Sequence, residues 1–175
     1  MSEPVPYLEK TVLFRARTEG YWNYRIPGLV VTPGGAILAY CEAREGRGGD
    51  WDPIDILMRR SIDGGRHWEP ARRLVRHADY PGGPIHNFVC IPEARTGQVQ
   101  ALYCNDYARA FHMSSADDGL IWSAPVEITD SAFGPFRPEY AWQVLAIGPG
   151  HGIQLDNGRR AGSWSPGRRP TATWP

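Results

Sequence analysis

Two arginines and two aspartates in the first third of the chain carry the side chains best suited to chemistry. Arg25 stands in the motif YRIPG (24–28), and Arg44 precedes a glycine-rich loop, residues 45–53, that contains Asp50 and Asp52. A guanidinium pairs with a carboxylate through two parallel hydrogen bonds, so either arginine is suited to an anionic ligand. An aspartate whose pKa is raised can donate and accept a proton. A salt bridge at a strand start and an ordinary loop aspartate are the structural alternatives.

An internal repeat indicates which elements position these residues. The pattern S-x-D-x-G-x-x-W occurs at 61–68 and again at 115–122, 54 residues later. The aspartate can accept hydrogen bonds from nearby amides, the glycine can adopt positive φ, and the tryptophan can pack beneath the turn. We therefore assign Asp63 and Asp117 a structural role. A repeat at this period is typical of the blades of a propeller.

The rest of the chain predicts short strands. Apolar stretches are brief and bounded by Gly, Pro, Asp or Asn, and Gly (20) and Pro (16) are plentiful. Turns every eight to twelve residues indicate an all-β sheet array. The expected strands are 28–31, 36–40, 54–59, 88–92, 99–105, 111–115 and 125–128.

Three motifs in one order resemble the sialidase, or neuraminidase, family. The repeated octapeptide is similar to the family's Asp-box, although His67 and Ile121 stand where the family usually has Thr. Arg25-Ile26-Pro27 matches the RIP motif that opens the catalytic domain, and Asp50 follows 25 residues later. The segment GPGHGIQL (148–155) resembles the family's GPGxGIQL. The resemblance implies an incomplete six-bladed β-propeller of sialidase type.

The resemblance also implies roles for these residues in an exo-α-sialidase, a retaining glycosidase that removes terminal sialic acid from glycoconjugates. Arg25 would be one of three arginines that bind the sialic-acid carboxylate, and Arg44 a further substrate contact. Asp50 would be the general acid/base, with a raised pKa, and Asp52 of the same loop is the alternative. The family nucleophile, a tyrosine paired with a glutamate, and the other two arginines belong to the C-terminal half and find no counterpart here.

The resemblance divides the chain into an N-terminal extension (1–10), a partial propeller (11–158) and a tail (159–175) outside the family pattern. About 50 residues per blade gives about three of six blades. The tail is dense in Arg, Pro and Gly, and a frameshift or premature end is our hypothesis for it. We therefore expect a truncated chain with an incomplete active site, little or no hydrolysis by this chain alone, and self-association through open blade edges.

Composition excludes several other classes. With 19 basic and 19 acidic residues, nucleic acid is not an expected partner. No apolar run is long enough for a membrane span, and the start lacks a signal peptide. This predicts a cytoplasmic chain, while a misassigned start codon would permit secretion. Histidine spacing predicts no metal, and we expect no cofactor. The three cysteines are expected as buried free thiols: Cys41, Cys90 and Cys104.

Two other functions fit parts of the pattern. A non-catalytic Asp-box module would bind sialoglycans or a protein partner without turnover. An unrelated Asp-box propeller, such as an endo-glucanase-like enzyme, is disfavoured because a neutral glucan offers Arg25 no carboxylate to bind.

Overall fold

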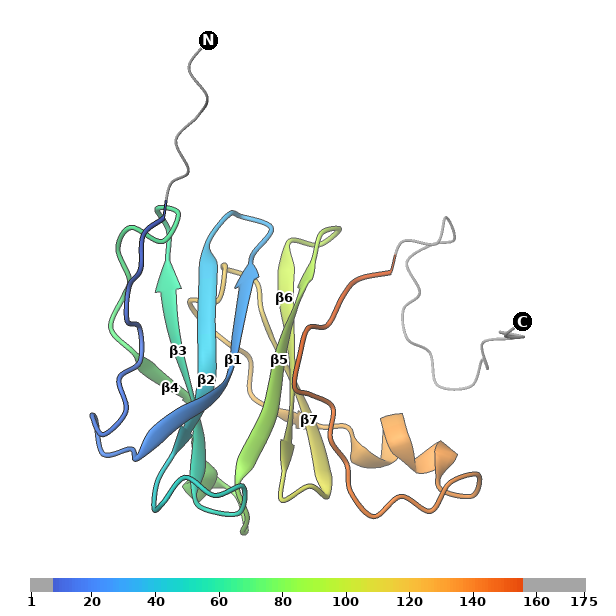
Figure 1. The fold of residues 1–175 in the computed structure, drawn as a ribbon. Helices are drawn as coiled ribbons and strands as arrows, with labels where there is room; N and C mark the ends of the chain where they lie inside the picture. The colour runs from blue at the N-terminus through green and yellow to red at the C-terminus, as the bar shows by residue number, and fades with distance from the viewer. Residues whose placement is uncertain (1–7, 156–175) are drawn as a thin grey trace.

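The computed structural model describes residues 8–155 and has two four-stranded antiparallel sheets (Figure 1). The first sheet contains β1 (Asn23–Val31), β2 (Ile37–Arg44), β3 (Ile54–Ser61) and β4 (Arg72–Val75). The second contains β5 (Ile85–Glu93), β6 (Gln98–Asn105), β7 (Arg109–Ser115) and β8 (Val126–Glu127). Three single helical turns lie outside the sheets, at His77–Asp79, Thr129–Phe133 and Gly134–Phe136. Each predicted strand overlaps an observed one, and the all-β class is confirmed.

The two Asp-boxes form the same turn after the third strand of each sheet. Ser61 Oγ and Ser115 Oγ both donate to the aspartate two residues on, at 2.9 and 2.8 Å. Asp63 Oδ1 accepts the amide of His67 at 2.9 Å, as Asp117 accepts that of Ile121 at 2.8 Å. Each tryptophan indole then donates to a glycine carbonyl of its own turn. Asp63 and Asp117 therefore have the structural role predicted for them.

One hydrophobic core joins the sheets. Tyr40 of β2 packs edge-on against Phe88 of β5, with ring centroids 5.0 Å apart. The Tyr40 hydroxyl also accepts the amide of Cys90 at 3.2 Å. Gly28 of β1 is required there, because a Cβ on it would lie 2.1 Å from the Tyr40 ring. Buried side chains of both sheets complete this core, among them Leu38, Ile56, Met58, Ile85, Val99, Tyr103 and Met113.

Polar contacts join the first sheet to the Asp-box turn of the second sheet. Arg60 Nε donates to the carbonyl of Asp118 at 2.9 Å, and Arg72 donates to the carbonyls of Gly119 and Leu120. The Asp118 carboxylate accepts the amide of Gly34 at 3.1 Å. The second Asp-box is thus held by arginines and an amide from the first sheet.

The end of the described chain, residues 148–154, lies along β5 (Figure 1). A Cβ on Gly148 would lie 2.9 Å from the carbonyl of Asn87, and a Cβ on Gly152 would lie 2.2 Å from the Ile91 side chain. Gln154 farther along accepts the amide of Ala94 at 2.9 Å. The GPGHGIQL segment therefore lies beside β5. In the same way, β5 lies beside β1, the first strand of the other sheet.

An incomplete propeller is confirmed. Within residues 8–155 the four-stranded sheets number two, against about three blades expected from length, because no strand forms after β8 there. The predicted tail (159–175) and residues 1–7 of the predicted N-terminal extension lie outside the described residues. Among the described residues, no helix is long and apolar enough to cross a membrane.

Candidate functional site

The candidate site begins at a bulge in β1. The pairing of β1 with β2 shifts register between Arg25 and Gly28, and Ile26 within this bulge has φ of 52°. Positive φ is a genuine outlier for a β-branched residue, and bulges often re-aim side chains beside functional sites. Here the bulge follows Arg25 directly.

Arg25 and Arg44 converge on Asp50. Arg44 NH1 lies 2.5 Å from Asp50 Oδ1, and Arg25 NH1 lies 3.4 Å from the same oxygen. The Arg44 side chain is buried at the end of β2, whereas those of Arg25 and Asp50 are 48% and 56% exposed. The structure thus brings together the three predicted site residues, with one buried cation beneath two groups open to solvent.

The pKa of Asp50 moves opposite to the expected direction. The hydrogen bond and the charge of Arg44 lower it, with a smaller contribution from Arg25. The expectation of a raised pKa is therefore wrong for the free protein. The reason is that arginines, not acids or a dry apolar wall, surround this carboxylate.

Asp52, the alternative acid, organises the loop instead. Its Oδ2 accepts the amides of Gly49 at 2.8 Å and of Arg47 at 3.0 Å, and these contacts lower its pKa. Asp50 faces the arginines while Asp52 closes the loop, so the geometry favours Asp50 for chemistry.

Glu42 and Asn87, which no sequence motif singled out, lie beneath the site. Glu42 is 2% exposed, and its Oε2 accepts Arg44 Nε at 3.1 Å and Arg44 NH2 at 2.5 Å. Its Oε1 accepts the amide of Asn87 in β5 at 3.0 Å. Glu42 therefore orients Arg44 and ties both sheets together beneath the site. An acid inside an otherwise apolar strand, two residues before Arg44, is the sequence signal that could have revealed it.

Three aromatic rings, of which two are stacked, lie near Asp50. His86, which is 1% exposed, stacks on Tyr107 with centroids 3.7 Å apart, and its Nε2 accepts the Tyr107 amide at 2.9 Å. Trp51 packs against Tyr107 at an interplanar angle of 57°, with ring centroids 4.9 Å apart, and is 67% exposed. Burial and the charge of Arg44 lower the pKa of His86 to about 4, so the ring is neutral at physiological pH.

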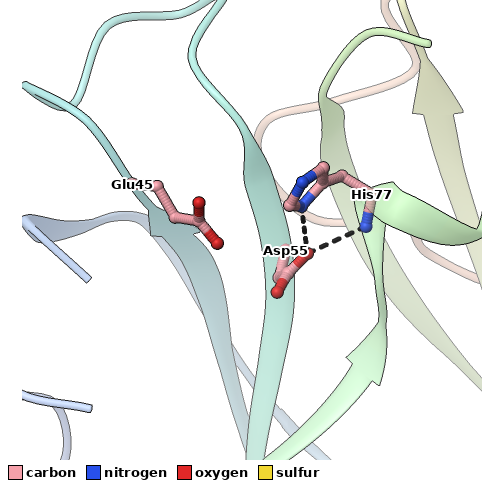
Figure 2. Close-up of side chains that lie close together, drawn as sticks. All are labelled: Glu45, Asp55 and His77. Atoms are coloured by element: carbon pink, nitrogen blue, oxygen red, sulfur yellow. Dashed lines mark hydrogen bonds and ion pairs between the residues drawn. The ribbon is translucent and has the colours of Figure 1, made fainter. Parts of the chain in front are cut away.

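A second polar cluster lies at the β2–β3 end of the first sheet. Glu45, Asp55 and His77 offer ligand atoms within 4.8 Å of one another. Figure 2 shows the ring and backbone nitrogens of His77 reaching Asp55, at 2.7 and 2.8 Å. The other Asp55 oxygen accepts the Tyr21 hydroxyl at 2.6 Å and pairs with Arg73 at 2.9 Å. Because protein donors and a cation already occupy this carboxylate, the cluster is better explained as a structural link between β3 and β4 than as a metal site.

Known proteins similar in sequence are sialidases. The chain is 32% identical to sialidase-3 of Bos taurus over 165 residues, which are 84% of this chain and 38% of that protein. It is 32% identical to a sialidase of Micromonospora viridifaciens over 181 residues, covering 91% of this chain and 27% of that protein. The chain thus spans about two fifths of the length of the first relative. No protein-family model matches it.

Solved structures agree. The Hadza microbial sialidase Hz136 superposes with a TM-score of 0.59 at 27% identity, over 66% of this chain and 28% of that one. A Trypanosoma rangeli sialidase bound to 2,3-difluorosialic acid shares the fold, with a TM-score of 0.58 at 18% identity, over 79% of this chain and 25% of that one. These relatives, together with the two Asp-boxes and an incomplete propeller that brings Arg25 next to Asp50, support a sialidase-family identity for the chain.

Proposed function

We propose that this chain carries the N-terminal part of an exo-α-sialidase site, which binds the carboxylate of a terminal sialic acid and places its glycosidic oxygen near Asp50. The observation that carries the proposal is the convergence of Arg25 and Arg44 on Asp50 Oδ1. Sialic acid bears a carboxylate on its anomeric carbon, so a guanidinium that binds this carboxylate also places the scissile bond nearby.

The exposure of the two arginines assigns them different tasks. Arg25 is half exposed and able to meet a ligand, while Arg44 is buried against Glu42. In our proposal Arg25 binds the substrate carboxylate, and Arg44 holds Asp50 in place and contacts substrate from beneath.

Substrate binding would also raise the pKa of Asp50. A bound carboxylate would share the positive charge of Arg25 and add a negative charge beside Asp50, and both effects raise the pKa of that carboxyl group. An acid ionised in the free protein would thereby become better able to protonate the leaving oxygen. In a retaining mechanism it would later activate water.

The binding half of the proposal is tested by titrating the chain with the methyl α-glycoside of N-acetylneuraminic acid, followed by calorimetry or NMR. We expect saturable binding, at least tenfold weaker for Arg25→Ala because a charge-assisted hydrogen bond is lost. Arg66→Ala, an exposed arginine in the first Asp-box, is the matched control and should bind as the wild type does. A ligand whose carboxylate is esterified should bind as weakly to the wild type as the acid does to Arg25→Ala.

Turnover is tested with a fluorogenic sialoside. Any hydrolysis should disappear in Asp50→Asn while binding of the methyl sialoside persists. Hydrolysis unchanged in Asp50→Asn would reject the acid/base assignment, and a folded chain that binds no sialoside at millimolar concentration would reject the proposed function.

A sialoglycan-binding module without turnover is the second candidate. The observation that favours it is the ionised, arginine-bound state of Asp50, which suits a carboxylate that organises a binding site. It predicts the same loss of binding in Arg25→Ala with no product from the fluorogenic sialoside.

A further inference from the structure

We propose that Trp51 forms the subsite for the sugar to which sialic acid is linked, and so determines which sialosides this chain prefers. This inference rests on the proposed function and concerns the other side of the scissile bond. Trp51 follows Asp50 directly, and its indole is 67% exposed. The indole is therefore accessible to a ligand bound at Asp50, and two features distinguish it from the other exposed apolar side chains.

The first feature is that neighbouring contacts fix the exposed indole. On one side Asp50 is bound by Arg44 at 2.5 Å, and on the other Asp52 accepts two loop amides. The ring itself rests on Tyr107, which stacks on the buried His86. A ring held in this way loses little conformational freedom when a ligand covers it.

The second feature is backbone strain beneath the indole. The turn from β6 to β7 closes with a hydrogen bond from the amide of Ala108 to the carbonyl of Asn105, and its central residues, Asp106 and Tyr107, have φ of 54° and 51°. Asn-Gly or Asp-Gly is favoured at such a turn, and a tyrosine there costs conformational energy. The strained residue is the one whose ring contacts Trp51, so a costly backbone conformation presents the Tyr107 ring to the indole.

The position of the surface identifies its ligand. The flat apolar face of an indole suits the C–H face of a pyranose, and its lack of charge suits a neutral sugar. Asp50 must reach the glycosidic oxygen, which joins sialic acid to the next sugar. With Arg25 on one side of Asp50 and Trp51 next to it in the chain, we assign Trp51 to the neutral hexose of the leaving group.

The test compares two ligands on the whole chain: the methyl α-sialoside, which lacks a second sugar, and sialyllactose, which has one. Trp51→Ala should bind sialyllactose about fivefold more weakly, the size expected for one aromatic contact, and the methyl sialoside as the wild type does. Trp51→Phe should restore part of the preference. Ile62→Ala, which removes an exposed apolar side chain in the first Asp-box, is the control and should change neither affinity. Saturation-transfer NMR should show contacts to the lactose protons in the wild type that vanish in Trp51→Ala.

The outcomes separate this inference from the one on which it rests. If neither ligand binds the wild type, the proposed function fails. If both bind and Trp51→Ala leaves sialyllactose unaffected, or weakens both ligands equally, then the assignment of Trp51 to the leaving sugar is overturned while the proposed function stands.

Discussion

Glu42 is the residue on which the geometry of the candidate site depends most. It is buried, it receives two nitrogens of Arg44, and it accepts a backbone amide of the neighbouring sheet. A buried ion pair adds little stability compared with an apolar pair, but removing one partner leaves an uncompensated charge. Glu42 therefore holds Arg44 from the core side, and Arg44 in turn holds the exposed carboxylate of Asp50.

Replacing Glu42 by Gln should destabilise the chain by about 3 kcal/mol, because the buried Arg44 loses its fully buried counter-charge. The measurement is urea denaturation at neutral pH. Glu69→Gln is a matched control, since the Glu69–Arg60 pair has a similar 2.9 Å contact but a glutamate that is 41% exposed. That variant should lose less than about 1 kcal/mol. Equal losses in the two variants would contradict the role given to Glu42.

His86 makes the stability of the chain depend on pH. Its pKa in the folded chain is about 4, against 6.5 for a free histidine, because burial disfavours the charged ring. Between pH 6.5 and about 4, His86 is protonated in the unfolded state but not in the folded state. Stability should therefore fall as pH drops from about 6.5 to about 4, by on the order of 3 kcal/mol from this residue.

The contribution is isolated by measuring denaturation at several pH values for the wild type and His86→Gln, which keeps an acceptor for the Tyr107 amide. Protonation of carboxylates destabilises both proteins at low pH. The difference between their plots of unfolding free energy against pH therefore gives the contribution of His86. Parallel curves across pH 4 to 7 would contradict the prediction. His112→Gln is a second comparison, since burial also lowers the pKa of that ring.

At the level of the strands, the first strand of each sheet has the same irregularity, which the sequence could not reveal. β1 shifts register after Arg25 and β5 after His86, and each bulge contains a residue with positive φ, Ile26 and Asn87. Hydrophobic pattern and turn residues predicted the strands, because period-two burial and Gly or Asp turns are local signals. An isoleucine at positive φ violates its local preference, so only the surrounding packing can impose it.

The Asp-box turns were predictable for the opposite reason, since each needs only its own side chains. The two turns differ in how closely the rest of the protein packs against their glycines. Gly65 and Gly119 occupy the same position in the two boxes, with φ of 88° and 79°. A Cβ on Gly65 would meet nothing closer than 3.7 Å, whereas one on Gly119 would lie 2.7 Å from Leu38 Cδ2.

Gly65→Ala and Gly119→Ala should therefore differ in stability. Both pay for positive φ, roughly 1 kcal/mol each. Gly119→Ala must also displace Leu38 in the core between the sheets, which adds about 1–3 kcal/mol. Thermal or urea unfolding of the two variants measures the difference directly. A Gly65 variant as unstable as the Gly119 variant would show that the clash with Leu38 is relieved at no cost.

For the molecule as a whole, the sequence predicted the class of fold and the proximity of Arg25 and Asp50 but not the contacts between sheets. Glu42 to Asn87, Tyr40 to Cys90 and Arg60 to Asp118 each join residues more than 40 positions apart. Such pairs have no local signature. The resemblance to a family assigned Arg25 and Asp50 to one active site because it preserves motif order, whereas the partners beneath the site depend on how one blade packs on the next.

These contacts predict that the two sheets unfold together, and the cysteines can report it. Burial raises the pKa of Cys41 in the first sheet to about 12 and that of Cys104 in the second to about 11. Because the thiolate is the reactive form, both thiols should resist alkylation in the native chain at pH 7.5.

Pulse alkylation across a urea series, followed by peptide mass spectrometry, gives a separate midpoint for each thiol. We expect the midpoints of Cys41 and Cys104 to coincide, since the two sheets share one core and the second Asp-box is held by Arg60 and Arg72. In Arg72→Ala, which loses contacts to that turn, both midpoints should fall to lower urea together. Separate midpoints in the wild type would mean that each sheet is stable alone and that the contacts between them contribute little.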